Sequence, residues 1–132
     1  MTAHNPHWLI RILGALVLLA VGGIHLFLVF DGVGGVLGAL FVVNAVAALV
    51  LLIGMLTLHG RLLQWATVLS LLFVIGTLAA LLLALTVGFF GITEVWSFTL
   101  VPQTIIVESI GIVVLAIATV AVFRRPAVRP AT

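Results

Sequence analysis

Hydrophobic residues form four long runs, separated by short breaks that contain polar residues or glycine. A helix that crosses a bilayer needs about 20 mostly apolar residues, and each run is at least that long. The pattern therefore predicts four membrane helices, at about residues 6–30, 36–58, 62–90 and 100–123. We expect the first run to stay in the membrane, because it is longer than the apolar part of a signal peptide and lacks a small-residue cleavage site.

The breaks carry residues that start and stop helices. Asn5-Pro6 is typical of a helix N-terminus, and Pro102 is tolerated within the first turn of the fourth helix. Gly60 and Gly91 are expected to end the second and third helices, and Thr99 to cap the fourth. Because the connections are only about five, three and nine residues long, neighbouring helices are expected to be antiparallel.

The predicted fold class is all-α, an integral membrane four-helix bundle with up-down-up-down topology. Residues 1–132 form a single domain, and the first helix should lie beside both the second and the fourth. The tail at 124–132 is polar and interrupted by proline, so it is expected to be disordered.

Charge placement predicts the orientation of this bundle. Asp31 and Glu94 fall on one side, and all arginines fall on the other: Arg11, Arg61, Arg124, Arg125 and Arg129. The positive-inside rule then places both termini in the cytoplasm, as in a multi-pass protein of the inner or plasma membrane. Trp8 and Trp65 match the cytoplasmic interface, and Trp96 matches the outer one.

Composition excludes several classes of protein. Hydrophobic residues make up 65% of the chain and charged residues 6%, against roughly 25% charged in a soluble domain. The absence of cysteine excludes disulfides and thiolate chemistry. Scattered arginines with a net charge of +2 do not form a nucleic-acid-binding surface. No catalytic triad, phosphate loop or zinc motif is present, so we do not expect an enzyme and assign no cofactor.

Each predicted helix has one face of small or polar residues, which should turn away from lipid. On the first and second helices the faces comprise Arg11, Gly14, Leu18, Gly22 and His25, and Leu40, Asn44 and Ala48. On the third and fourth they comprise Thr67, Ser70, Val74 and Thr77, and Thr104, Glu108, Gly111 and Leu115. We expect the hydroxyls to bond across to neighbouring helices. The Arg11 side chain is expected to extend toward the cytoplasmic surface.

Three of the most polar intramembrane groups are predicted to lie at similar depth. At 1.5 Å per residue, His25, Glu108 and Asn44 lie about 8, 9 and 12 Å below the outer interface. We expect His25 and Glu108 to face each other, with Asn44, Gln103 and Ser109 nearby. A carboxyl inside an apolar helix is a candidate functional group by default.

Three interpretations of this cluster are open. His25 and Glu108 form a buried hydrogen-bonded pair that fixes helix register, or they line a pocket, open to the outside, that binds a proton, a cation or a polar head group. Such a pair can titrate near neutrality. In the third interpretation the two side chains do not meet.

The function favoured by the sequence is an accessory or interaction subunit of a membrane complex, because there is no soluble domain and little polar chemistry. The alternative is binding or transport of an ion, proton or small molecule through an outer-leaflet His25/Glu108 pocket. Bis-histidine haem would need His25 from two copies of the chain, and His25, Glu108 and Asn44 lack the spacing of a metal motif. The expected partners are the lipid bilayer and either further copies of the chain or a larger membrane complex.

Two segments carry a resemblance: Gly22-Gly23-Ile24-His25-Leu26 and Phe41-Val42-Val43-Asn44-Ala45-Val46-Ala47-Ala48. With them the chain resembles small, mostly uncharacterised four-helix bacterial integral membrane proteins. It is similar to the DoxX-type families in helix count only. The resemblance implies the membrane fold and no activity.

Overall fold

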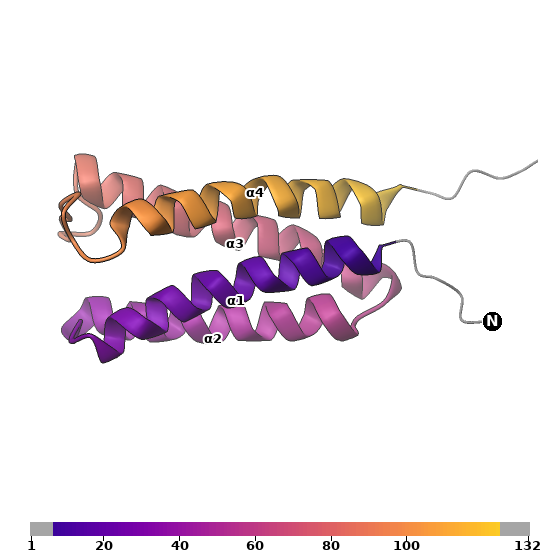
Figure 1. The fold of residues 1–132 in the computed structure, drawn as a ribbon, viewed down its shortest axis with the longest axis horizontal. Helices are drawn as coiled ribbons and strands as arrows, with labels where there is room; N and C mark the ends of the chain where they lie inside the picture. Colours follow the sequence, from indigo (N-terminus) through magenta and orange to yellow (C-terminus); the bar gives the residue numbers. More distant parts are fainter. Residues whose placement is uncertain (1–6, 125–132) are drawn as a thin grey trace, which may run out of the picture.

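The structure is a computed structural model that describes residues 7–124, and these form an all-α bundle. Its helices are α1 (Trp8–Phe30), α2 (Gly35–Thr57), α3 (Gly60–Thr86) and α4 (Val101–Phe123) (Figure 1). All four are long and apolar enough to cross a membrane, as predicted. The expected N-terminal signal at Asn5-Pro6, Arg125, Arg129 and almost all of the expected disordered tail lie outside the described residues.

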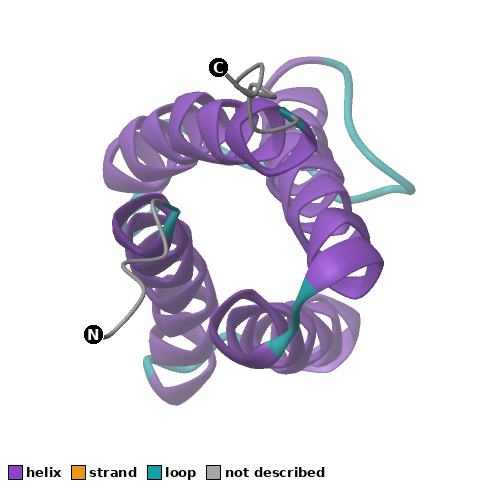
Figure 2. Cartoon of the chain, turned by 90° about the vertical axis from the view of Figure 1, so that its right-hand side faces the viewer, coloured by secondary structure: helices purple, strands orange, loops and turns teal. Residues whose placement is uncertain are grey.

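Seen end-on, the four helices form a ring (Figure 2). The contact between α1 and α4 is present, as expected, and the contact between α2 and α3 is the least extensive of the four in the ring. We call the end where α1 begins and α4 ends the terminal end, and the opposite end, which carries the loop at 87–100, the loop end (Figure 1). The α1–α2 and α3–α4 pairs diverge toward the loop end (Figure 1).

The third helix ends earlier than predicted. Gly88, rather than Gly91, occupies the left-handed position after α3, with φ of 87°, and its N–H bonds to the Leu83 carbonyl oxygen at 2.8 Å. Gly91 instead lies in a tight turn closed by two hydrogen bonds between Phe89 and Ile92. Both central residues of this turn have positive φ, 47° at Phe90 and 78° at Gly91, which is the geometry of a type I′ turn.

Two other boundary residues differ from expectation. Gly60 does not end the second helix, because α2 ends at Thr57 and Gly60 is the first residue of α3. Thr99 does not cap α4, because the cap position is taken by Leu100 in a left-handed conformation with φ of 63°. Pro102 lies in the first turn, as expected.

The predicted inward faces are confirmed for α1 and α4, where every predicted position is buried. On α2 the prediction is met only in part, since Ala48 is buried but Leu40 is 47% exposed. The hydroxyls expected to bond across to neighbouring helices donate instead to carbonyls of their own helix, at Thr67, Ser70 and Thr77. Helical Ser and Thr satisfy their hydroxyls in this way without a partner helix.

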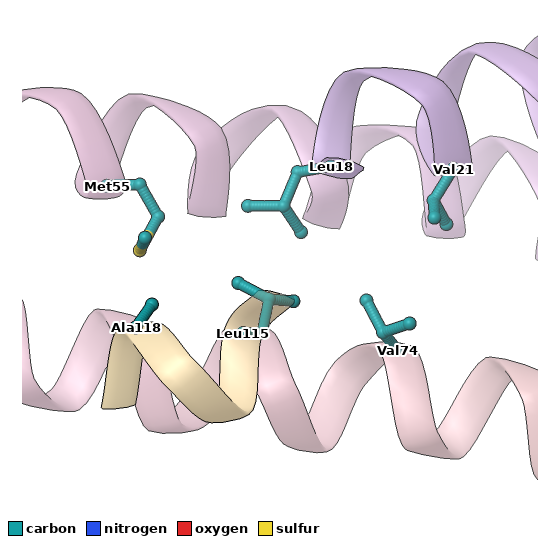
Figure 3. Close-up of a cluster of buried hydrophobic side chains, with 6 residues drawn as sticks. All are labelled: Leu18, Val21, Met55, Val74, Leu115 and Ala118. Atoms are coloured by element: carbon teal, nitrogen blue, oxygen red, sulfur yellow. The ribbon is translucent and has the colours of Figure 1, made fainter. Parts of the chain in front are cut away.

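The hydrophobic core fills the middle of the bundle and extends toward its terminal end. It is formed by Leu18, Val21, Met55, Val74, Leu115 and Ala118 (Figure 3). Glycines allow the helices to approach closely here, since a Cβ added at Gly22 would lie only 2.8 Å from the Cβ of Ala48. This packing holds the four helices together in the middle of the bundle and toward its terminal end.

Candidate functional site

A cavity of about 440 Å³ lies in the loop-end half of the bundle. Its lining comes from all four helices and from the loop at 87–100. On three helices the lining residue farthest from the loop end is polar: His25 on α1, Asn44 on α2 and Glu108 on α4. These three residues form what we call the floor of the cavity, and the sequence placed the same three at similar depth.

The walls above the floor are mostly apolar, with Leu28, Leu37, Phe41, Leu81, Phe89 and Phe98 among them. Toward the terminal end, the bundle is filled by the fully buried side chains of the core, including Leu18 and Leu115 (Figure 3). The cavity is therefore an apolar recess with a polar floor, and packed side chains separate it from the opposite end of the bundle.

Glu108 is the most unusual residue of the floor. Its side chain is only 1% exposed, and neither carboxyl oxygen has a hydrogen-bond partner among the residues the structure describes. Thr77 faces it from α3, but the single hydroxyl proton of Thr77 goes to the Val74 carbonyl oxygen at 3.0 Å. Leaving a buried polar group unpaired costs about 1–3 kcal/mol, and more when the group is charged.

His25 is held by its own helix and by α2. Its Nδ1 lies 2.8 Å from the carbonyl oxygen of Val21, and its ring meets Phe41 edge-on with the ring centres 5.0 Å apart. Because a carbonyl oxygen only accepts, Nδ1 carries the hydrogen, and Nε2 of a neutral ring is an acceptor.

Of the three interpretations, the hydrogen-bonded pair between His25 and Glu108 is not found in the structure. The Nδ1–H of His25 is committed to Val21, and both oxygens of Glu108 remain without a donor within residues 7–124. The two side chains share a cavity without bonding each other.

The floor's third member, Asn44, is half-buried, and its Oδ1 also lacks a partner in the described chain. Gln103 and Ser109, which we expected nearby, are exposed and do not line the cavity. Each directly adjoins an inward residue, Thr104 or Glu108, and one step along a helix turns a side chain by about 100°. The inward face of α4 was predicted correctly at Thr104 and Glu108, but Gln103 and Ser109, one residue away in sequence, lie on other faces of the helix.

The sequence did not identify Glu94 as a site residue, although it lines the cavity from the loop. Its backbone N–H bonds to the Ala84 carbonyl oxygen at 2.9 Å, which holds the loop against the end of α3. Burial raises the pKa of the Glu94 carboxyl, and a hydrogen bond from the Val95 N–H opposes this in part. The alternation of polar and apolar residues at 91–98 is the sequence feature that could have indicated that part of this loop packs against the bundle.

Arg11 lies in the other half of the bundle and does not extend toward solvent as expected. It is 6% exposed, and its guanidinium donates to the carbonyl oxygens of Met55 at 2.7 Å and Leu58 at 2.8 Å. The last carbonyls of a helix have no intrahelical partner and carry partial negative charge. Arg11 satisfies two of them at the end of α2.

Comparison with known proteins assigns no relative: no family model, no curated protein and no solved structure matches the chain. Within residues 7–124, no three or more His, Cys, Asp or Glu side chains are grouped to hold a metal ion. The chemical feature of the site is the polar floor of the cavity, where Glu108 Oε1, Glu108 Oε2 and Asn44 Oδ1 are acceptors without a partner in the described residues.

Proposed function

We propose that this protein binds a small molecule with a hydrogen-bond-donating polar group in the cavity above Glu108, His25 and Asn44. The observation that carries the proposal is the buried Glu108 carboxyl, which has no donor in the described chain although it lines a cavity of about 440 Å³. Ligand sites are typically cavities of about 300–1,000 Å³ with apolar walls and a few placed polar groups.

In this proposal the protein is a multi-pass protein of the bacterial inner or plasma membrane with both termini in the cytoplasm. Arg11, Arg61 and Arg124 belong to the terminal end, while Asp31 and Glu94 belong to the loop end, which favours that orientation. The cavity then opens in the outer half of the bilayer. Since packed core residues lie between it and the cytoplasmic end, binding or sensing is favoured over conduction through one copy of the chain.

A role as an accessory subunit of a membrane complex, in a homo-oligomer or with other proteins, is the second candidate. It is favoured by α2, which buries only Gly38, Ala48 and Met55 within the bundle and leaves most of its surface for neighbours in the membrane. The two candidates differ in what they require of Glu108. A scaffold should tolerate Glu108→Gln, whereas a binding site that uses the carboxylate should not.

The test is to purify the protein in mild detergent and to record its native mass spectrum and visible spectrum. We expect a bound small molecule on the wild type that is lost in Glu108→Gln. Ser109→Ala is the matched control, because Ser109 adjoins Glu108 in sequence but is exposed and does not line the cavity. Identical bound masses in all three proteins, or none in any, would favour the accessory role.

A further inference from the structure

The polar groups around the cavity floor are short of hydrogen-bond donors. Glu108 Oε1, Glu108 Oε2 and Asn44 Oδ1 are buried acceptors without a partner in the described chain. Two neighbouring hydroxyls are already engaged, since Thr104 donates to the Leu100 carbonyl oxygen at 2.7 Å and Thr77 to that of Val74. A ligand that complements this floor must therefore bring several donors of its own.

The charge of the cavity is also one-sided. Two carboxyl groups line it, Glu108 at the floor and Glu94 in the loop, and no arginine does. Arg11, the buried arginine of the described chain, is bound to the end of α2 in the other half of the bundle. A cation is the charge that complements such a site, because a buried carboxylate is stabilised by an opposite charge.

The walls exclude a bare or hydrated ion as a good fit. Apolar side chains, chiefly leucine and phenylalanine, make up most of the lining, and the volume of about 440 Å³ far exceeds that of a single ion. Apolar walls gain free energy only when they cover an apolar body. The complementary molecule thus combines a donor-rich cationic head with an apolar tail.

On α2 and α3 the lining of the cavity includes exposed residues, which favours an opening toward the lipid on that side. The cavity is lined on α2 by Leu40 and on α3 by Leu72 and Gly76, all exposed, with Leu40 47% and Leu72 57% exposed. A Cβ added at Gly76 would meet nothing within 4 Å, and α2 and α3 make the least extensive contact in the ring. Residues of the loop at 87–100 cover the loop end of the same cavity.

From these observations we infer that the ligand is a lipophilic primary amine, which enters from the bilayer between α2 and α3 and places its ammonium group against Glu108 and Asn44. This inference rests on the proposed function and names the ligand class. An ammonium group has three N–H donors, and three partnerless acceptor atoms lie at the floor. Charge-assisted hydrogen bonds of this kind are roughly twice as strong as neutral ones.

The test uses four probes with the same tail and different heads: decylamine, decyltrimethylammonium, decanol and decanoate. Binding of each to the protein in phosphatidylcholine nanodiscs is measured by native mass spectrometry, for wild type, Glu108→Gln and Ser70→Ala. Ser70 is buried but does not line the cavity, so its variant is the control. The ratio of wild type to variant cancels the partition of each probe into lipid.

We expect the ratio of wild-type to Glu108→Gln binding to be at least tenfold larger for decylamine than for the other probes, and the ratio of wild type to Ser70→Ala to be near one for every probe. Equal binding of all four probes would overturn the amine assignment while leaving a binding cavity. Binding of decyltrimethylammonium as tight as that of decylamine would show that charge alone is recognised, and would also overturn it. Failure of every probe would overturn the proposed function as well.

The entry route is tested at Gly76. Gly76→Phe should lower decylamine occupancy at least tenfold by filling the opening, whereas Gly76→Ala should not. Leu72→Trp, on the same side of the cavity, is a second variant in case Gly76→Phe does not fold, as judged by helical circular dichroism. Unchanged occupancy in the folded bulky variants would overturn entry between α2 and α3.

Discussion

The two halves of the bundle each bury a charged side chain, but they satisfy it differently. In the terminal-end half, the guanidinium of Arg11 donates to two carbonyl oxygens at the end of α2. In the loop-end half, the carboxyl of Glu108 is even less exposed and has no donor within the described residues. Burying an ionisable group is costly in either half, and within residues 7–124 hydrogen bonds offset that cost for Arg11 but not for Glu108.

Packing also differs between the two halves, and the half with the unpartnered carboxyl is the less tightly packed one. Toward the terminal end the two helix pairs approach each other, whereas toward the loop end they diverge (Figure 1). The core residues pack in the middle of the bundle (Figure 3), and the cavity lined by Glu108 lies in the loop-end half. The buried guanidinium of Arg11, which is hydrogen-bonded in a packed region, is explained by its contribution to the stability of the fold. An unpartnered ionisable group beside a cavity favours a ligand that supplies the missing donors, as the proposed function requires.

The largest effect is expected from Arg11→Met. The change removes two hydrogen bonds from a charged donor and leaves the Met55 and Leu58 carbonyl oxygens without it. We expect a loss of about 3 kcal/mol in the free energy of unfolding. Reversible unfolding in mixed micelles of dodecyl maltoside and SDS measures it. Arg61→Met, at an exposed arginine of the same end, should change stability by less than about 0.5 kcal/mol.

If Arg11→Met matched Arg61→Met, the guanidinium would not be needed to stabilise the end of α2. The terminal-end half would then no longer differ from the loop-end half in having a buried ionisable group that stabilises the fold.

Much of the difference between the two halves of the bundle could be predicted from the sequence. The spacing of small and polar residues identified the buried faces of α1 and α4, and counting residues from the helix ends put three polar groups at one level. These inferences succeeded because they depend only on helical periodicity and rise. The burial of Leu40 was overestimated, since it lines the cavity but stays 47% exposed, because α2 carries little small or polar pattern to show which side faces inward.

Other features depend on tertiary geometry that a single chain pattern does not encode. The destination of Arg11 depends on where α2 ends in space, and a periodic pattern does not locate that end relative to α1. Gly88 and Gly91 are both credible helix ends by residue type, and only the backbone hydrogen bonds decide between them. The missing donor for Glu108 is likewise a property of the assembled cavity.

The packing contrast is tested by one substitution at two glycines. A Cβ added at Gly111 would lie 2.5 Å from the Cγ1 of Val17, whereas one added at Gly76 meets nothing within 4 Å. Gly111→Ala should therefore destabilise the protein by about 2 kcal/mol. Gly76→Ala should be neutral or stabilise it by up to about 1 kcal/mol, since alanine favours helix more than glycine does. Equal losses in the same unfolding assay would contradict a difference in packing.

A smaller effect of opposite sign is expected for Glu108→Met. The substitution replaces an unpartnered buried carboxyl by an apolar side chain of similar length, so the free energy of unfolding should rise by about 1 kcal/mol. Glu108→Gln, which keeps a buried polar group, should gain less. A loss comparable to that of Arg11→Met would mean that the carboxyl has a stabilising partner, and the two halves would then be alike.

The smallest effect concerns Glu94, the second carboxyl of the loop-end half. Burial raises its pKa above the ordinary 4.5, so the folded state binds a proton at higher pH than the unfolded state does. Stability must then rise as pH falls toward and through the raised pKa, because the penalty of the buried charge disappears. The rise should be slight, because the side chain is only half-buried.

Unfolding midpoints measured from about pH 7 to about pH 5 check this sign. Glu94→Gln should lack the part of the rise that belongs to this residue, whereas Asp31→Asn, at an exposed carboxyl of the same end, should retain it. If wild type instead lost stability relative to Glu94→Gln as pH fell, Glu94 would be held in its charged form by a favourable partner. The loop-end half would then contain one carboxylate that is stabilised by a partner. Glu108 would be the remaining carboxyl of that half that differs from Arg11 in lacking such a partner.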